Sequence, residues 1–315
     1  CASVFWFATY KQHREKERMA QIMDGFQAGV VRTGEITIAY QIAGSGPPLL
    51  LLHGFPQTKM IWHRVAPVLA EHFTVIASDL RGYGASSKPP GLADHSNYSK
   101  RAMANDQAQL MNALGFSQYS VLGHDRGGRV AHRLALDYGD QVKKLMVLDI
   151  SPTLAMYEQT SMRFASSYWH WFFLIQKAPI PETMIGANTE FFMQQFMGGR
   201  HAGLGIFAPS CWQEYLAAMR DPACVHAMCE DYRAAASIDL IHDRQTLANG
   251  QRLEMPMRVL WGEFGQVNAC FNPLADWQAL ASHVTGQTVP SGHYIPEEIP
   301  EVLIAEALTF FAAPP

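Results

Sequence analysis

The stretch GHDRGGRVAHR, residues 123–133, has the pattern of a nucleophile turn, with Asp125 where the nucleophile stands. Glycines at positions 123 and 127 let a strand and the next helix approach closely, so the side chain between them is lifted into the open. We therefore predict that Asp125 is a nucleophile. The alternative is that Asp125 only caps the helix that follows.

A carboxylate nucleophile selects the reaction. A serine that attacks a saturated carbon forms an ether, which water does not cleave easily, whereas an aspartate forms an ester whose carbonyl group belongs to the enzyme. Water deprotonated by a histidine attacks that carbonyl group and restores the aspartate. Asp125 therefore indicates dehalogenation or epoxide opening, and the turn has no serine or cysteine for a serine-esterase type of reaction.

A base and a second acid are expected at other strand ends. His293, in VPSGHYIPEE, follows the last expected strand, and Asp149 ends the strand after the nucleophile. The chain order of Asp125, Asp149 and His293 is that of nucleophile, acid and base in α/β-hydrolases. We predict that His293 activates water and that Asp149 holds its tautomer, with Glu263 as the rival for the acid.

Two arginines follow the nucleophile. Arg126 and Arg129 are three residues apart at a helix start, hence on one face. Their guanidinium groups are predicted to grip a substrate carboxylate in paired hydrogen bonds. The alternative for Arg129 is a surface ion pair. The backbone N–H groups of Phe55, in HGFP, and of Arg126 are expected to form an oxyanion hole.

Three neutral donors stand farther along the chain. His170 and Trp171, in YWHWFF, and Tyr232, in EDYRA, offer N–H or O–H groups that suit a departing halide. The alternative is that they are core aromatics. Epoxide opening would instead need acidic hydroxyls, with Tyr157 or Tyr168 as a partner for Tyr232.

The elements that must position these residues form an α/β pattern. AGVVRT and EITIAYQIAG flank Gly34 as a hairpin, and PPLLLLHGFP reads as a strand buried on both faces. Strand-then-loop units recur in FTVIASDLRGYG, YSVLGHDRGG and KLMVLDISP, with helix-length segments between them. This alternation predicts a mostly parallel central sheet flanked by helices, with ligands beyond the carboxyl ends of its strands.

The chain divides into a core with an insertion. Residues 25–152 and 250–315 are expected to form the α/β-hydrolase core, and residues 153–249, rich in aromatics at helical spacing, an inserted helical cap over the site. Residues 1–24 are interpreted as an N-terminal extension, disordered or foreign to the native chain, with a start near Met23. The alternative is a lipoprotein-like end led by Cys1.

The amino-acid composition indicates which kinds of binding partner the protein is expected to have. With 315 residues, 48% hydrophobic, the chain can bury a sizeable core, and a net charge of −4 without a basic stripe disfavours nucleic acid and membrane surfaces. Five cysteines without a C-x-x-C pair favour free thiols in a reducing compartment. Cys224, His226 and Cys229 are read as a buried helix face, so no metal is expected.

Several segments carry a family resemblance. They resemble the fluoroacetate dehalogenases of the α/β-hydrolase superfamily. The segments are HGFPQ, DLRGYGASSKP, GHDRGGRVAHRLALDYG, LDISPT, WHWFF, CEDYRA, and SGHY followed after one residue by PEE. The likeness runs from about Gly29 to Phe311 and is densest from His53 to Asp149. A stretch from Phe192 to Gly205 departs from it, which leaves pocket size and substrate access open.

The resemblance implies hydrolysis of small 2-haloacids, foremost fluoroacetate to glycolate and fluoride, by a cytoplasmic homodimer without a cofactor. It implies the same roles for the catalytic, carboxylate-binding and halide-binding residues named above. Epoxide hydrolysis is the alternative, although a neutral epoxide has no use for the paired arginines. A binding protein with the same fold and no turnover would be expected to show a broken triad.

Overall fold

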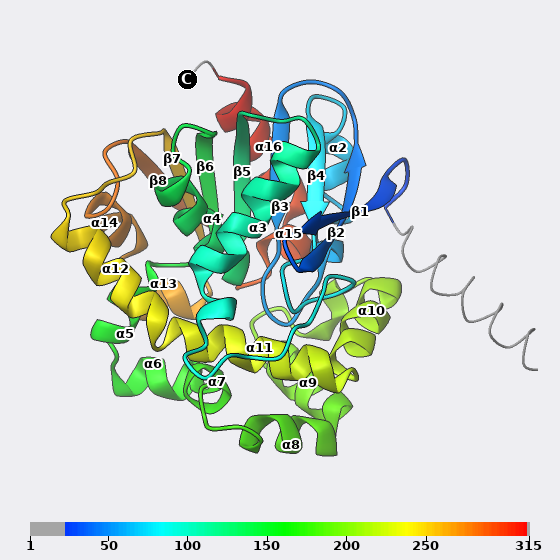
Figure 1. The fold of residues 1–315 in the computed structure, drawn as a ribbon, viewed down its shortest axis with the longest axis vertical. Helices are drawn as coiled ribbons and strands as arrows, with labels where there is room; N and C mark the ends of the chain where they lie inside the picture. The colour runs from blue at the N-terminus through cyan, green and yellow to red at the C-terminus, as the bar shows by residue number, and fades with distance from the viewer. Residues whose placement is uncertain (1–22, 314–315) are drawn as a thin grey trace, which may run out of the picture.

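The computed structural model describes residues 23–313, so the expected 1–24 extension lies almost wholly outside the described residues. Within them an eight-stranded sheet has the order β1-β2-β4-β3-β5-β6-β7-β8 (Figure 1). The strands are β1 (Gln27–Thr33), β2 (Ile36–Ala43), β3 (Pro48–Leu52), β4 (Thr74–Ser78), β5 (Tyr119–His124), β6 (Val142–Leu148), β7 (Met257–Gly262) and β8 (Val284–Val289). From β4 to β8 all neighbours are parallel, as the alternating pattern predicted.

The sequence of each strand matches its place in the sheet. β1 and β2 form the predicted antiparallel hairpin, in which Gly34 takes the left-handed conformation with φ 65°. β3 lies between β4 and β5, and all four of its leucines are fully buried. A continuous apolar run is what a central parallel strand needs, because helices cover both faces.

Helices cover the two faces of the sheet. α3 (Lys100–Ala113) and α4 (Arg126–Asp137) pack side by side on one face, where the His132 ring of α4 meets the Trp277 ring of α14 (Pro273–Gln278). α2 (Ala66–Leu69) and α16 (Pro300–Ala312) contact each other. The remaining core helices are η1 (Lys59–Trp62), η2 (Ser96–Tyr98), α13 (Gln266–Cys270) and α15 (Ile295–Glu298). No helix within residues 23–313 is long and apolar enough to span a bilayer.

A run of helices separates β6 from β7. It comprises α5 (Thr153–Glu158), α6 (Met162–Ser167), α7 (Trp169–Leu174), α8 (Ile180–Ala187), α9 (Thr189–Gly198), η3 (Leu204–Ile206), α10 (Pro209–Met219), α11 (Pro222–Ala235) and α12 (Ile238–Ala248). These helices gather along one end of the sheet, in the lower half of Figure 1. Their extent matches the predicted cap, residues 153–249; its status as a separate domain stays a prediction.

Candidate active site

Asp125 occupies the turn between β5 and α4 in a left-handed conformation, with φ 48° and ψ −115°. A positive φ is strained for a residue with a Cβ atom. The neighbouring backbone leaves little choice: a Cβ at Gly123 would lie 2.7 Å from the Gly127 carbonyl oxygen, and one at Gly127 would lie 2.3 Å from that of Leu52. Asp125 makes no side-chain capping bond to α4, so the helix-cap alternative does not explain it.

The two oxygens of the Asp125 carboxylate have different surroundings. Oδ1 accepts a hydrogen bond of 2.9 Å from the backbone N–H of Phe55, as expected for half of an oxyanion hole. Oδ2 lies 3.9 Å from Nε2 of His293. Burial raises the pKa of Asp125, but two neighbouring histidines and two arginines outweigh it and hold that pKa well below its usual range. The carboxylate is thus ionised, with Oδ1 held by a hydrogen bond and Oδ2 free to attack.

His293 is held by Asp149. His293 Nδ1 lies 2.6 Å from Asp149 Oδ2, and Asp149 Oδ1 accepts a 3.0 Å hydrogen bond from the backbone N–H of Gly262. Glu263, the rival for this position, has an exposed side chain. Burial raises the pKa of Asp149 to about 7, whereas burial and then Arg200 lower the pKa of His293 to about 3. An uncharged His293 is the form that can remove a proton from water.

Arg126 is fully buried and fixed by an aspartate of α11. Its Nε and Nη2 donate to the Asp231 carboxylate at 3.0 and 2.7 Å, and Nη2 also donates to the Asp231 carbonyl oxygen at 2.9 Å. Tyr83 and Lys100 donate to the same carboxylate. The guanidinium group lies 4.1 Å from the ring centre of Tyr232, and its Nη1 has no hydrogen-bond partner. One N–H edge is therefore left for a ligand.

Arg129 is also buried, so the surface ion pair considered from the sequence is wrong. Its Nη1 donates to the Ser151 carbonyl oxygen and to Thr153 Oγ1, both at 3.0 Å. Its guanidinium group lies 4.7 Å from the ring centre of Trp171, and its Nε has no partner. Both arginines thus keep an unused, buried N–H group. Either N–H would gain a strong hydrogen bond from a carboxylate.

The three predicted halide donors come together. The ring centres of His170 and Trp171 lie 6.0 and 6.3 Å from that of Tyr232, which itself packs 5.3 Å from the Phe55 ring. His170 Nδ1, Trp171 Nε1 and Tyr232 Oη are all buried without hydrogen-bond partners. Buried polar groups seldom stay unpaired unless a ligand or water satisfies them. The cluster therefore suits a small acceptor such as fluoride.

Two further residues were not found from the sequence. Asp231 fixes Arg126, and the only signal was its place beside Tyr232 in CEDYRA. Arg200, in the stretch that departs from the family, lies close enough to lower the pKa values of His293 and His170 after burial has done so. No spacing in the sequence links Arg200 to the nucleophile turn.

Comparison with known proteins agrees with this geometry. A family model described as alpha/beta hydrolase fold matches residues 47–300. The chain belongs to this family. Among alpha/beta hydrolases, a solved structure from Nostoc sp PCC 7120, described as a putative alpha/beta hydrolase, matches with a TM-score of 0.90 and 49% identity, over 93% of this chain and 100% of that one. The fold predicted from the sequence is confirmed.

Two curated relatives bear on the chemistry. A fluoroacetate dehalogenase from Burkholderia sp is 45% identical over 281 residues, which cover 89% of this chain and 92% of the relative. A soluble epoxide hydrolase from Corynebacterium sp. (strain C12) is 34% identical over 281 residues, covering 87% and 93%. The resemblance inferred from sequence motifs is thereby confirmed, and the higher identity is to the dehalogenase.

Proposed function

We propose that this alpha/beta hydrolase cleaves the carbon–halogen bond of small 2-haloacids, fluoroacetate foremost. Arg126 and Arg129 bind the substrate carboxylate and turn its α-carbon toward Asp125. Asp125 Oδ2 attacks that carbon, a C–O bond forms, and the halogen leaves with the electron pair of the broken bond. His170, Trp171 and Tyr232 donate hydrogen bonds to the departing halide, which lowers the cost of forming a small anion in a buried site.

The second half-reaction hydrolyses the ester on Asp125. His293 takes a proton from water, and the resulting hydroxide attacks Cγ of Asp125. Negative charge collects on Oδ1, where the N–H of Phe55 already donates, and we assign the second donor to the backbone N–H of Arg126. The tetrahedral intermediate then collapses. It releases the 2-hydroxyacid, whose alkoxide oxygen takes up the proton held by His293. Asp125 is left as a carboxylic acid, and it becomes the carboxylate again when its proton is lost to solvent.

One observation carries this proposal: an ionised carboxylate in a nucleophile turn is followed by two buried arginines that each keep an unpaired N–H group. Repulsion would oppose the approach of an anionic substrate to Asp125. Two cations beside the nucleophile remove that barrier, and their N–H groups match the two oxygens of a carboxylate. The 45% identical fluoroacetate dehalogenase supports the same substrate class.

Halide release tests the proposal. Fluoroacetate and chloroacetate are incubated with wild-type protein and with Asp125→Asn, with fluoride measured by ion-selective electrode and chloride by chromatography. We expect both halides from the wild type and neither from the variant. Chloride without fluoride would keep the mechanism and refute the fluoride role of the three donors. No halide at all, with styrene oxide opened, would overturn the proposal.

Epoxide hydrolysis is the second candidate, supported by the 34% identical epoxide hydrolase. It needs phenols that protonate the opening oxygen. Tyr157, Tyr168 and Tyr232 all have buried hydroxyls without partners. Burial, however, raises the pKa of Tyr157 to about 12 and raises that of Tyr232 well above its ordinary value, which makes both weaker acids. The dehalogenase proposal uses both arginines and is therefore preferred.

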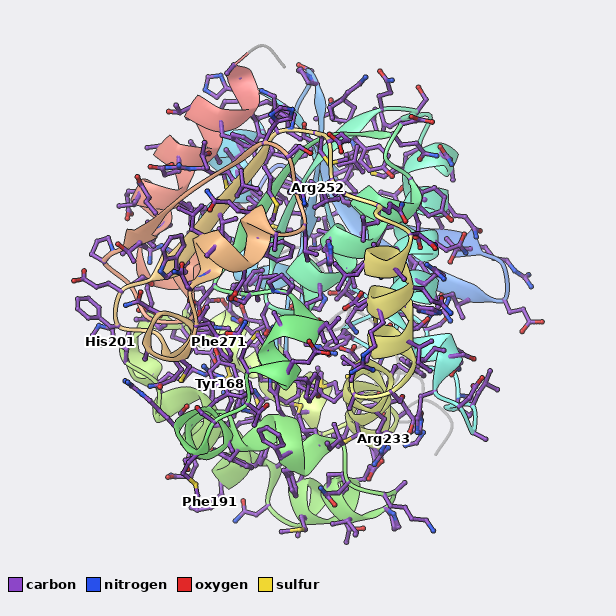
Figure 2. All side chains as sticks on the ribbon, turned by 90° about the vertical axis from the view of Figure 1, so that its left-hand side faces the viewer. Tyr168, Phe191, His201, Arg233, Arg252 and Phe271 are labelled. Atoms are coloured by element: carbon purple, nitrogen blue, oxygen red, sulfur yellow. The ribbon has the colours of Figure 1, made fainter. Side chains whose placement is uncertain are left out.

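Two properties of the whole protein are proposed together with the dehalogenase function. A homodimer is supported by apolar side chains on the cap helices, where Met162, Met184 and Phe191 are 84, 62 and 59% exposed. Figure 2 labels Phe191 at the outer side of the cap. A cytoplasmic location is supported by the free thiols of the four described cysteines. Size-exclusion chromatography with light scattering distinguishes dimer from monomer.

A further inference from the structure

A third arginine reaches toward the site from the cap. Arg200 follows α9, and its guanidinium group lies 4.9, 5.3 and 5.6 Å from the ring centres of Phe196, Tyr168 and Tyr294. Tyr294 is the neighbour of His293 in the chain. Figure 2 shows Tyr168 and His201, the residue after Arg200, at the level where the cap helices meet the core. Arg200 thus lies at the junction between the cap and the core.

Arg200 differs from Arg126 in how its charge is balanced. Arg126 is paired with Asp231, but within residues 23–313 no carboxylate forms an ion pair with Arg200, and its Nε is buried without a hydrogen-bond partner. An arginine stays charged under all ordinary conditions. The Arg200 side chain is only partly buried, and the Asp125 carboxylate is close enough to act on its charge. Its buried Nε–H is nevertheless a free, charged donor, which an anion in the neighbouring space can use.

A cavity places that cation on the approach to the base. Arg200 and His293 both line a cavity of about 420 Å³, whose walls come from the cap and from the loops after β7 and β8. Trp169 and Phe264 belong to its lining and are 43 and 49% exposed, so the cavity opens to solvent. Asp125 is not among its lining residues. The cavity therefore reaches the base His293 but not the nucleophile, and we call it the vestibule.

We propose that Arg200 is a specificity-determining residue that binds the carboxylate of an incoming haloacid in this vestibule, so that the enzyme admits small anions in preference to neutral molecules of the same size. The proposal rests on the proposed dehalogenase function. A low-dielectric wall carrying one sign of charge focuses its field and raises the local concentration of the opposite ion. The substrate carboxylate then moves from Arg200 to Arg126 and Arg129, whose free N–H groups bind it beside Asp125.

Ligand binding without turnover gives the direct test. Glycolate, the anionic product, and glycolamide, its neutral counterpart of similar size, are titrated while tryptophan fluorescence is recorded, since Trp169 lines the vestibule. We expect Arg200→Met to weaken glycolate binding on the order of tenfold and to leave glycolamide binding nearly unchanged. Arg200→Lys, which keeps the charge, should retain most of the glycolate affinity.

Arg220→Met is the matched control. Arg220 is an exposed cap residue paired with Glu190, so its loss changes the net charge equally but removes no vestibule cation. Glycolate affinity should not change in this variant. Equal effects of Arg200→Met and Arg220→Met would overturn the proposal. Equal weakening of glycolate and glycolamide would also overturn it, because Arg200 would then act through packing.

Kinetics separates this proposal from the proposed function. In Arg200→Met, kcat/KM for chloroacetate should fall mainly through KM and lose most of its dependence on salt, because screening acts on the removed charge. A wild type that releases no halide, with glycolate binding still weakened by Arg200→Met, would refute dehalogenation and leave the anion vestibule standing. Halide release with unchanged glycolate affinity would refute the vestibule alone.

Discussion

Asp231→Asn tests whether the cap positions the carboxylate-binding arginine. Asp231 is fully buried and accepts hydrogen bonds from Arg126, Tyr83 and Lys100. Burial raises its pKa, but Arg126 and Lys100 hold that pKa well below its usual range, so the native carboxylate is ionised. Asparagine keeps the shape but removes the charge. Two buried cations then lose their common counter-charge.

The magnitude follows from this geometry. Removing one partner of a buried ion pair costs about 3–5 kcal/mol of unfolding free energy. For a large domain, about 2 °C is lost for each kcal/mol, so Tm should fall by about 6–10 °C. The guanidinium of Arg126 also loses the carboxylate that fixes its free Nη1 edge. A charge-assisted hydrogen bond is worth about 1.5–3 kcal/mol, so KM for chloroacetate should rise roughly tenfold or more.

The assay compares Asp231→Asn with Asp106→Asn. Asp106 on α3 is also buried and accepts two hydrogen bonds from Arg81, at 2.8 and 2.7 Å, but touches neither Arg126 nor Arg129. Thermal unfolding and chloride-release kinetics are measured for both variants. Both should be destabilised, and only Asp231→Asn should raise KM. If KM changes equally in the two variants, or in neither, Asp231 does not position Arg126.

Two further outcomes are expected. Trp171→Phe removes one halide donor and should reduce kcat for fluoroacetate by about 10²–10³-fold, with a smaller loss for chloroacetate because chloride leaves more readily. Fluoride release is measured with an ion-selective electrode and chloride release by chromatography. Equal losses of kcat for the two substrates would argue against a fluoride-specific role. Halide turnover should halve near pH 7 and fall at lower pH, because a protonated Asp149 donates to His293 Nδ1 and leaves Nε2 unable to accept a proton. Rates measured from pH 5 to 9 check this, and a profile that stays flat to pH 5 contradicts it.

The nucleophile turn was predictable because its determinants are local. Glycines at 123 and 127 lie within two residues of Asp125, and the positive φ of Asp125 follows from the contacts that those glycines allow. Position at strand ends also predicted that His293 and Asp149 would approach Asp125, because parallel strands present their carboxyl ends on one edge. Asp149 was preferred to Glu263 from the sequence although both residues end strands, and the structure brings Asp149 Oδ2 to 2.6 Å from His293 Nδ1.

The residues that hold the catalytic and binding side chains in place were not predictable, because their contacts join segments far apart in the sequence. Arg126 and Asp231 are 105 residues apart, and no local pattern indicates that α11 crosses above the nucleophile turn. Arg200 lies in a loop whose sequence has no hydrophobic periodicity, and its position near His293 depends on how the cap packs against the core. For Arg129 the sequence left a surface pair open, and packing against Trp171 placed it inside.

The most direct test of the central claim is one turnover of chloroacetate in ¹⁸O-labelled water with enzyme in excess, followed by mass spectrometry of the glycolate and of the peptide that contains Asp125. If Asp125 forms the ester, the oxygen added to the first glycolate comes from the carboxylate. The glycolate should therefore be unlabelled, and the Asp125 peptide should gain one ¹⁸O atom. Labelled glycolate with an unlabelled peptide would mean that water attacks the substrate directly, and would contradict the account.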